Sequence, residues 1–400
     1  MNPHSLEQFQ FIRLREQLHY ARMHSPYYRK RLEGQDIENI RDRSSLPLLP
    51  FTQAEALREE PQKLCCISCG DVPRIITLNT SGSSGDTKRV WFSRPDLERT
   101  IEFFAQGMAT MIGPGKTALI LFSGNTQDSL GDLLGRALAG IGVNPIIHGP
   151  VKEMDAAIIH AAQKADCIIG LPVQLNRLCL SSATVPRPET VLLTADYIPQ
   201  GIINNIRNVW GSEVFTHYGM TESGFGLAVQ CSEHEAQHLR DAEFIIEIID
   251  PESGKPLPDG QWGELALTSL CNEAMPLIRY RTGDITRRIV EPCSCGGCLP
   301  RLDIVKGRIS NTKKKYPIHA LDEALFLLPG LLDYRANILN GNGLELTLDG
   351  LSVYSEDELR QVLETQGLEP PVLKFRNEAL PVYRGPEKRK IRNQISIRTQ

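Results

Sequence analysis

The chain has 400 residues, which is enough for two or three structural units and a large buried core. Hydrophobic residues make up 41% and charged residues 23%, and the net charge of −4 gives no general attraction for nucleic acid or an anionic membrane. No apolar run approaches the ~20 residues of a transmembrane helix, and the first residues lack the pattern of a signal peptide. We therefore expect a cytoplasmic protein with no nucleic-acid or membrane partner.

The N-terminal part is expected to be helical. Apolar side chains recur at near-helical spacing over 6–33, where Pro26 breaks or kinks the pattern. A stiff, proline-containing connector follows over 46–52. Thr52 at its end is expected to cap the next helix, with Glu55 at the capping-box position.

A β-rich apolar stretch at 75–78 leads into a run of hydroxyl side chains and glycines that ends at Lys88. Glycines let backbone N–H groups turn toward a ligand, and successive N–H groups form an anion site to which Lys88 adds a mobile positive charge. The run at 80–88 is either a polyphosphate-binding loop or a flexible surface loop. It does not match the Walker pattern, because two residues separate Gly85 from Lys88, so a kinase or P-loop motor is disfavoured.

Strand and helix patterns alternate from 75 to about 215, which predicts βαβ units and a mostly parallel sheet. The expected strands lie at 117–122, 144–147, 167–170, 190–193 and 214–216, and the expected helices at 127–140, 153–164 and 199–210.

The rest of the chain predicts two further kinds of structure. Residues 243–250 and 262–268 are expected to form strands joined by a turn. After about 308, a helix at 318–328, a strand at 344–348, a helix at 355–366 and a basic tail indicate a small α+β unit.

Two polar segments follow apolar strands. In the first, Tyr218 offers a flat face for a base, Thr221 a hydroxyl and Glu222 a metal-binding carboxylate, at a strand end where ligands of parallel sheets collect. In the second, an apolar strand from 276 ends in a Gly-Asp turn, where Asp284 can accept both hydroxyls of a ribose. An ordinary strand-to-loop transition and an ordinary tight turn are the alternative interpretations.

Taken together, the segments 80–88, 218–222 and 280–284 resemble the motifs of the adenylate-forming superfamily of acyl-CoA synthetases, luciferases and adenylation domains. The phenylacetate–CoA ligase family is more similar, through Ser-Pro-Tyr-Tyr at 25–28, Leu-Pro-Phe-Thr at 49–52 and the segments 247–260 and 273–281. The resemblance covers nearly the whole chain. It implies an α/β fold with a large N-terminal adenylation domain over 1–307, built from mostly parallel sheets and a small β-rich part. A small mobile α+β C-terminal domain over 308–400 would follow.

The resemblance implies an AMP-forming carboxylic acid–CoA ligase. A carboxylic acid, by resemblance aryl or arylalkyl, attacks the α-phosphate of ATP to give an acyl-adenylate and pyrophosphate, and coenzyme A then displaces AMP. ATP, Mg²⁺ and coenzyme A are the implied cofactors and co-substrates. A homodimer is implied by analogy.

The same resemblance assigns residues to the nucleotide. Tyr218 stacks on adenine, Thr221 contacts the α-phosphate, Glu222 binds Mg²⁺, and Asp284 and Arg308 reach the ribose. The remaining nucleotide contacts are expected from Thr80, Ser81, Gly82, Ser83, Ser84, Gly85 and Lys88, which would hold the β- and γ-phosphates, and from Ala195, Asp196, His217, Gly219 and Met220.

A lysine on the C-terminal domain is also implied, to meet the attacking carboxylate and the α-phosphate. Lys388 is the first choice and Lys390 the second, and a solvated basic tail is the alternative.

Ten cysteines are many for a reducing compartment, where clusters favour metal ligands over disulfides. Some phenylacetate–CoA ligase relatives bind one structural zinc through a Cys, a His and a Cys-x-Cys, which implies the ligands Cys231, His238, Cys293 and Cys295. Cys298 and His234 could each replace one ligand, and reduced thiols without metal are the alternative. The cluster of Cys65, Cys66 and Cys69 lacks a clear fourth partner and is interpreted as structural.

The chain departs from the family pattern in two places. Thr87 replaces the usual proline before the loop lysine, and the segment after Arg308 lacks the acidic hinge residue and is basic at 313–315. An adenylating enzyme that passes the acyl or AMP group to a carrier protein, an amine or a deazaflavin cofactor is therefore an alternative. A nucleotide-binding, non-catalytic partner protein is another, although the retained Glu222, Asp284 and Lys388 argue against it.

Overall fold

The computed structural model describes residues 3–79, 87–181, 187–309, 315–339, 342–381 and 392–393. The chain forms two compact units. Unit 1 comprises Met1–Pro114, Gly124–Val143 and Phe215–Ile309, and unit 2 comprises Gly115–Ser123, Asn144–Val214 and Ser310–Gln400. A boundary between functional domains at 307/308 stays a prediction.

Unit 1 begins with two separate helices, so Pro26 breaks the helical pattern rather than kinking a single helix. α1 (Pro3–His24) is followed at once by α2 (Pro26–Arg31), and the Ser25 side chain accepts a hydrogen bond from the Tyr28 amide at 3.2 Å. Pro26 is favourable here because the first helical residue needs no N–H partner. The further helical segments of unit 1 are α3 (Ala56–Glu59), α4 (Pro61–Leu64), α5 (Arg94–Ala109), α6 (Leu130–Gly140), and the 3₁₀ turns η1 (Ile37–Asn39), η2 (Arg43–Leu48), η3 (Cys69–Asp71) and η4 (Thr221–Ser223).

The helix cap predicted at Thr52 is wrong. The Thr52 side chain is buried, donates to the Ile278 carbonyl at 2.8 Å and lies 2.8 Å from the Tyr28 hydroxyl. Glu55 directly precedes α3, and no side chain caps that helix. A long-range contact uses the hydroxyl that the local pattern assigned to a cap.

The strands of unit 1 are antiparallel. β1 (Arg74–Asn79) pairs with β2 (Thr87–Phe92), with Asn79 opposite Thr87, and a second sheet has the order β10-β11-β12. A third group of strands pairs in the order β13-β14-β9-β8 and then the unit 1 part of β7. The bounds are β7 (Glu213–Tyr218), β8 (Ala228–Gln230), β9 (Gln237–Leu239), β10 (Phe244–Ile249), β11 (Gly263–Ser269), β12 (Tyr280–Thr286), β13 (Arg288–Ile289) and β14 (Arg301–Leu302). The strands expected at 75–78, 243–250 and 262–268 are confirmed.

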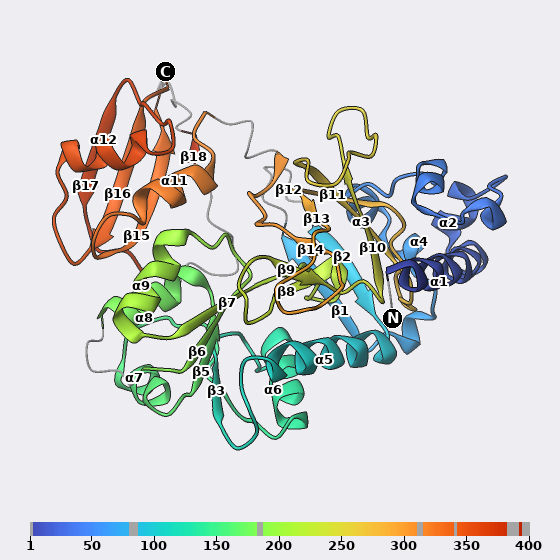
Figure 1. Ribbon diagram of the computed structural model, residues 1–400, viewed down its shortest axis with the longest axis horizontal. Helices are drawn as coiled ribbons and strands as arrows, with labels where there is room; N and C mark the ends of the chain where they lie inside the picture. Colours follow the sequence, from blue (N-terminus) through green and yellow to red (C-terminus); the bar gives the residue numbers. More distant parts are fainter. Residues whose placement is uncertain are drawn as a thin grey trace, which may run out of the picture. The chain divides into compact units, whose positions relative to one another are not determined.

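Unit 2 contains the predicted βαβ pattern. Its strands β6-β5-β3-β4 are parallel, which confirms the strands expected there. A four-stranded sheet of order β17-β16-β15-β18 lies beside α11 and α12, which cover one of its faces (Figure 1). The bounds are β3 (Thr117–Ile120), β4 (Asn144–Ile147), β5 (Cys167–Gly170), β6 (Thr190–Leu193), α7 (Ala156–Gln163), α8 (Pro172–Ser181), α9 (Gln200–Trp210), α11 (Ile318–Leu325), α12 (Glu356–Glu364), β15 (Leu331–Ile338), β16 (Leu344–Gly350), β17 (Leu373–Asn377) and β18 (Arg392–Asn393).

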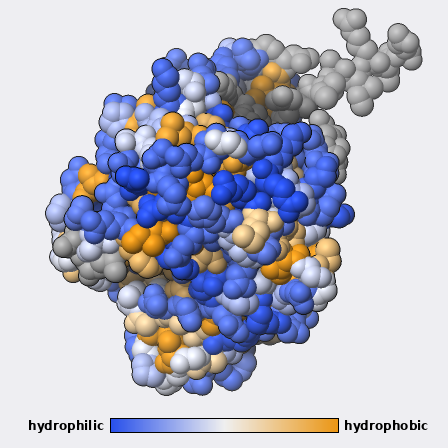
Figure 2. All heavy atoms as spheres, turned by 90° about the vertical axis from the view of Figure 1, so that its right-hand side faces the viewer, coloured by the Kyte–Doolittle hydropathy of each residue, from blue (hydrophilic) through white to orange (hydrophobic). Residues whose placement is uncertain are grey.

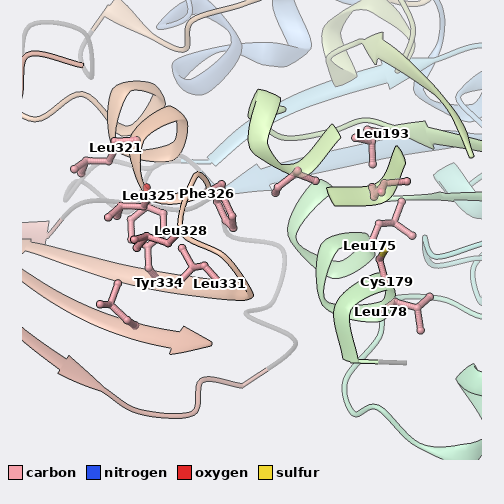
Figure 3. Packing of buried hydrophobic residues seen from close by; sticks show 14 of the residues in the cluster. Leu175, Leu178, Cys179, Leu193, Leu321, Leu325, Phe326, Leu328, Leu331 and Tyr334 are labelled. Carbon is pink, nitrogen blue, oxygen red and sulfur yellow. The ribbon is translucent and has the colours of Figure 1, made fainter. Parts of the chain in front are cut away.

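One hydrophobic core joins the two parts of unit 2. Side chains of α8 and β6 belong to the same buried cluster as those of α11 and β15 (Figure 3). The buried Asn176 amide donates to the Leu331 carbonyl at 2.8 Å. Gly201 of α9 packs so closely that a Cβ there would lie 2.3 Å from the Phe326 carbonyl oxygen. These contacts explain why residues 310–400 cluster with 144–214 rather than alone.

On one face of the molecule, the polarity of the surface agrees with the ordinary content of charged residues (Figure 2). The face shown in Figure 2 is mainly hydrophilic, with hydrophobic residues in separate small patches. Among the described helices, none has the length and apolar character needed to cross a membrane.

Candidate active site

Lys88 is buried near the start of β2. Only 4% of the residue is exposed, and its ammonium lies 3.1 Å from Glu222 Oε1. The sequence suggested a mobile charge at the end of a loop. The structure instead fixes this charge in a buried ion pair, because β1 and β2 place residue 88 inside the unit rather than on its surface.

Glu222 lies in η4, the short turn after β7. The turn is held by Ser223, whose hydroxyl donates to the Met220 carbonyl at 3.0 Å, and it ends at Gly224 in the left-handed conformation. Burial raises the pKa of the Glu222 carboxyl, but the charges of Lys88 and Arg308 outweigh burial and bring that pKa below its ordinary value. The side chain is therefore a buried carboxylate.

Tyr280 completes this group from β12. Its hydroxyl lies 2.7 Å from the Lys88 ammonium and donates to Glu222 Oε1 at 2.9 Å. Burial and the neighbouring carboxylate raise the pKa of Tyr280 well above its ordinary value, so the phenol keeps its proton.

Asp284 lies beside this group and binds two side chains. Its carboxylate accepts a hydrogen bond from the Tyr218 hydroxyl at 2.7 Å and pairs with Arg308 Nε at 3.4 Å. Burial and the Asp284 charge raise the pKa of Tyr218 well above its ordinary value. Tyr218, Asp284 and Arg308, which lie far apart in the sequence, thus form one cluster in unit 1.

The Gly-Asp turn expected at 283–284 is a bulge within a longer strand. β12 continues to Thr286, and its pairing with β11 shifts register between Glu264 and Ala266. Gly283 has φ +76°, a conformation that glycine adopts at no steric cost. The bulge leaves Asp284 inside the sheet with 6% of the residue exposed.

His217 and Gly219 flank Tyr218 in a tightly packed region. A Cβ on Gly219 would lie 1.9 Å from the Phe225 carbonyl oxygen and 2.8 Å from the His217 ring, so only glycine fits there. Burial lowers the pKa of His217 to about 4, which keeps the imidazole neutral near pH 7. Its ring lies 6.1 Å from that of Phe103.

Four metal-binding side chains meet elsewhere in unit 1. The donor atoms of Cys231, His238, Cys293 and Cys295 all lie within 4.8 Å of one another. Cys231 Sγ and Cys293 Sγ are 3.7 Å apart, and Cys295 Sγ lies 3.5 Å from His238 Nε2. Among the described residues, the candidate metal-binding groups do not extend to Cys65, Cys66 and Cys69.

The buried Arg301 lies near this Cys/His cluster and interacts electrostatically with Cys231 and Cys293. Arg301 is 4% exposed, pairs with Glu235, and donates to the Glu291 carbonyl at 3.0 Å. Burial lowers the pKa of His238, as does the charge of Arg301, so the imidazole is neutral and can act as a ligand.

Comparison with known proteins identifies relatives of the chain. No family model matches. The phenylacetate–coenzyme A ligase of Thermus thermophilus is 29% identical over 315 residues, which cover 76% of this chain and 70% of that ligase. The Escherichia coli enzyme of the same name is 28% identical over 321 residues, covering 76% and 71%. The chain is therefore similar to phenylacetate–coenzyme A ligases over about three quarters of its length.

Solved structures agree with that relationship at the level of the fold. A 2-hydroxyisobutyryl-CoA ligase in the postadenylation state, in complex with R3-HIB-AMP, matches with a TM-score of 0.84 at 19% identity, covering 98% of this chain and 91% of that one. The same ligase with 2-HIB-AMP and CoA in the thioesterification state gives 0.71 at 18% identity, over 98% and 91%. The chain therefore has the α/β fold of this acyl-CoA ligase, as expected.

Several residues of the predicted site lie outside the described part of the chain. These are the loop residues Thr80, Ser81, Gly82, Ser83, Ser84 and Gly85, and the lysines Lys388 and Lys390. Ala195 and Asp196 belong to unit 2, where Ala195 has φ +70° and Asp196 accepts a hydrogen bond from the Tyr197 amide at 2.8 Å.

Tyr280 has no role that the sequence predicts, although it lies in the motif at 280–284. A tyrosine at the start of an apolar strand is expected to be buried. The neighbouring residues in the sequence do not indicate that its hydroxyl contacts Lys88 and Glu222. Arg301 was missed for the same reason, because its neighbours at 235 and 291–292 are brought together only by pairing of β13, β14 and β9.

Proposed function

We propose that this protein is an ATP-dependent, AMP-forming ligase that joins an aromatic carboxylic acid to coenzyme A. The observation that carries the proposal is the convergence of Glu222, Tyr218, Asp284 and Arg308 in one unit, in a chain related to phenylacetate–CoA ligases over most of its length. The acid becomes an acyl-adenylate with release of pyrophosphate, and the thiol of coenzyme A then displaces AMP to give the thioester.

The site binds the nucleoside through neighbouring side chains. Tyr218 lies against the adenine, with its hydroxyl on Asp284, and His217, Gly219 and Met220 form the adjoining wall. Asp284 and Arg308 take the ribose hydroxyls, which a carboxylate and a guanidinium can bind as acceptor and donors. Ala195 and Asp196 contribute from the segment after β6.

The phosphates are held by groups that balance their charge. The loop 80–88 takes the β- and γ-phosphates, Thr221 the α-phosphate, and Lys388 the attacking carboxylate, so that most catalysis is positioning and charge neutralisation. Glu222 fits Mg²⁺, because it is an ionised oxygen donor held in a buried position. When bound, the ion would neutralise charge on the phosphates.

The Cys/His cluster is proposed to hold one structural zinc. Ideal tetrahedral geometry with Zn–S of about 2.3 Å and Zn–N of about 2.0–2.1 Å places two sulfurs ~3.8 Å apart and a sulfur and nitrogen ~3.5 Å apart. The separations of 3.7 Å for Cys231–Cys293 and 3.5 Å for Cys295–His238 match these values. Cys298 and His234 are not needed to complete four ligands.

A panel of aromatic and arylalkyl acids, scored for pyrophosphate release with and without coenzyme A, tests the function. We expect release with at least one acid, and an acyl-CoA product only when coenzyme A is present. Acyl-AMP without acyl-CoA would favour transfer to a carrier protein, an amine or another acceptor. No pyrophosphate with any acid would favour the non-catalytic alternative. The cytoplasmic location and the homodimer stay predictions, and light scattering measures the second.

A further inference from the structure

We propose that Tyr280 is a positioning residue that keeps the Glu222 carboxylate available to Mg²⁺ by diverting the Lys88 ammonium. The proposal rests on the proposed function in one respect, which is that Glu222 is the carboxylate that binds the metal. It adds a residue that touches neither nucleotide nor acid and acts through its two neighbours.

Three polar atoms form a closed triangle in the interior of unit 1. The Lys88 ammonium lies 2.7 Å from the Tyr280 hydroxyl and 3.1 Å from Glu222 Oε1, and the hydroxyl lies 2.9 Å from the same Oε1. Lys88 and Glu222 are each 4% exposed, and Tyr280 is fully buried. Water therefore has little access to these groups.

The protons of the triangle fix the direction of each hydrogen bond. An ammonium can only donate and a carboxylate can only accept, so the single phenolic proton goes to Glu222 and the phenol oxygen accepts from Lys88. The hydroxyl is thus both an acceptor for the cation and a donor for the anion.

This arrangement limits how strongly Lys88 neutralises Glu222. The ammonium is closer to the phenol oxygen than to the carboxylate, and the bonds from Lys88 and Tyr280 both end on Glu222 Oε1. Without the hydroxyl, the ammonium would lose one acceptor, and the only described partner left in the triangle would be the carboxylate. In a buried site, where charges interact strongly, a closer ammonium competes directly with a metal ion for that carboxylate.

The hydroxyl also links three segments of the site. Lys88 follows the segment 80–86 directly, Glu222 belongs to the turn after β7, and Tyr280 is the first residue of β12, which carries Asp284. One bond from β12 to each of the other segments fixes their relative position. The consequence for catalysis is a dependence of MgATP binding, rather than of ATP binding as such, on Tyr280.

The test compares Tyr280→Phe with wild type and with Tyr28→Phe. Tyr28 is a matched control, because it is a buried tyrosine of unit 1 whose hydroxyl is bonded to Thr52 and Ile278 and not to Glu222. Calorimetric titration with ATP at a series of Mg²⁺ concentrations gives the affinity for ATP at each one. The half-saturating Mg²⁺ concentration is the one at which the effect of Mg²⁺ on this affinity is half of its maximum. This readout requires neither the acid nor coenzyme A.

We expect Tyr280→Phe to raise the half-saturating Mg²⁺ concentration about tenfold or more, because the variant removes a hydrogen bond to a charged group. ATP binding without Mg²⁺ should change less than about twofold, and saturating Mg²⁺ should restore binding. Tyr28→Phe should leave the Mg²⁺ dependence unchanged. An equal shift in both variants, or none in Tyr280→Phe, overturns the proposal.

A second background isolates the role of the ammonium. Lys88→Gln removes the competing charge, so Tyr280→Phe added to it should shift the Mg²⁺ dependence less than about twofold. A full additive shift in the double variant overturns the proposal. Lys88→Gln alone should lower the half-saturating Mg²⁺ concentration. If this variant instead raises that concentration, the proposal is overturned, and this result can be obtained even where Tyr280→Phe does not fold. The acid panel tests the ligase function separately. If the wild-type protein binds MgATP but releases no pyrophosphate, the ligase function is wrong, while the measurements on Tyr280 remain valid.

Discussion

Replacing Lys88 by methionine breaks the buried ion pair with Glu222 and should destabilise unit 1 strongly. The Lys88 and Glu222 side chains are only 5% and 4% exposed, so water cannot take the place of the lost ammonium. Removing one partner of such a pair costs about 3–5 kcal/mol, because the other charge stays buried. Unit 1 falls in the size range where 1 kcal/mol shifts the melting temperature by about 2–4 °C, which gives a loss of about 6–20 °C.

The loss should depend on pH in a defined direction. In the native protein, the pKa of Glu222 lies below its ordinary value of 4.5, so its contribution to stability is present above that value and is lost as the pH falls through the lower native pKa. In Lys88→Met the strongest lowering influence is lost, and we expect burial, the largest influence on this group, to raise the pKa of Glu222 above 4.5. The protonated carboxyl is then preferred only below the raised pKa, and stability falls as the pH rises through that pKa. The deficit of the variant should therefore be greatest at pH 8 and smaller at pH 5.

Scanning calorimetry of the protein without ligands, from pH 5 to pH 8, measures both effects. Lys63→Met is the matched control, because Lys63 pairs with Glu60 in unit 1 with both side chains about half exposed. An exposed pair contributes about 0–1 kcal/mol, so the control should lose at most about 4 °C. A deficit for Lys88→Met that matches the control, or that does not shrink toward pH 5, would refute the reasoning.

Three further outcomes are expected. Cys293→Ser should reduce bound zinc, measured by mass spectrometry of protein purified without chelator, from one per chain to near zero, and a metal-free wild type would contradict the site. Gly219→Ala should destabilise the protein by about 1–3 kcal/mol through overpacking and reduce pyrophosphate release, whereas Gly140→Ala, where a Cβ meets nothing within 4 Å, should not. Lys388→Ala should suppress pyrophosphate release at least tenfold while Lys390→Ala retains it, and the reverse result would exchange the two roles.

The sequence alone determined the order of the elements in most of the chain. The strands at 117–120, 144–147, 167–170 and 190–193 alternate with helices, and a pattern of short apolar runs between amphipathic stretches is a local property that a sequence displays directly. It also singled out Tyr218, Glu222 and Asp284 from short, contiguous motifs, and the structure brings these residues close together in unit 1. The strands and helices predicted from apolar periodicity were therefore confirmed where the structure tests them.

Tertiary structure decided which partner each polar group takes. Thr52 looked like a helix cap, yet its hydroxyl is used by Tyr28 and Ile278, which come from α2 and from the segment before β12. Lys88 looked like a mobile loop charge, yet strand pairing buries it on Glu222 and Tyr280. Local patterns specify what a side chain can bind. The partner that is present depends on contacts across 134 and 192 residues of sequence, and only the folded chain brings these together.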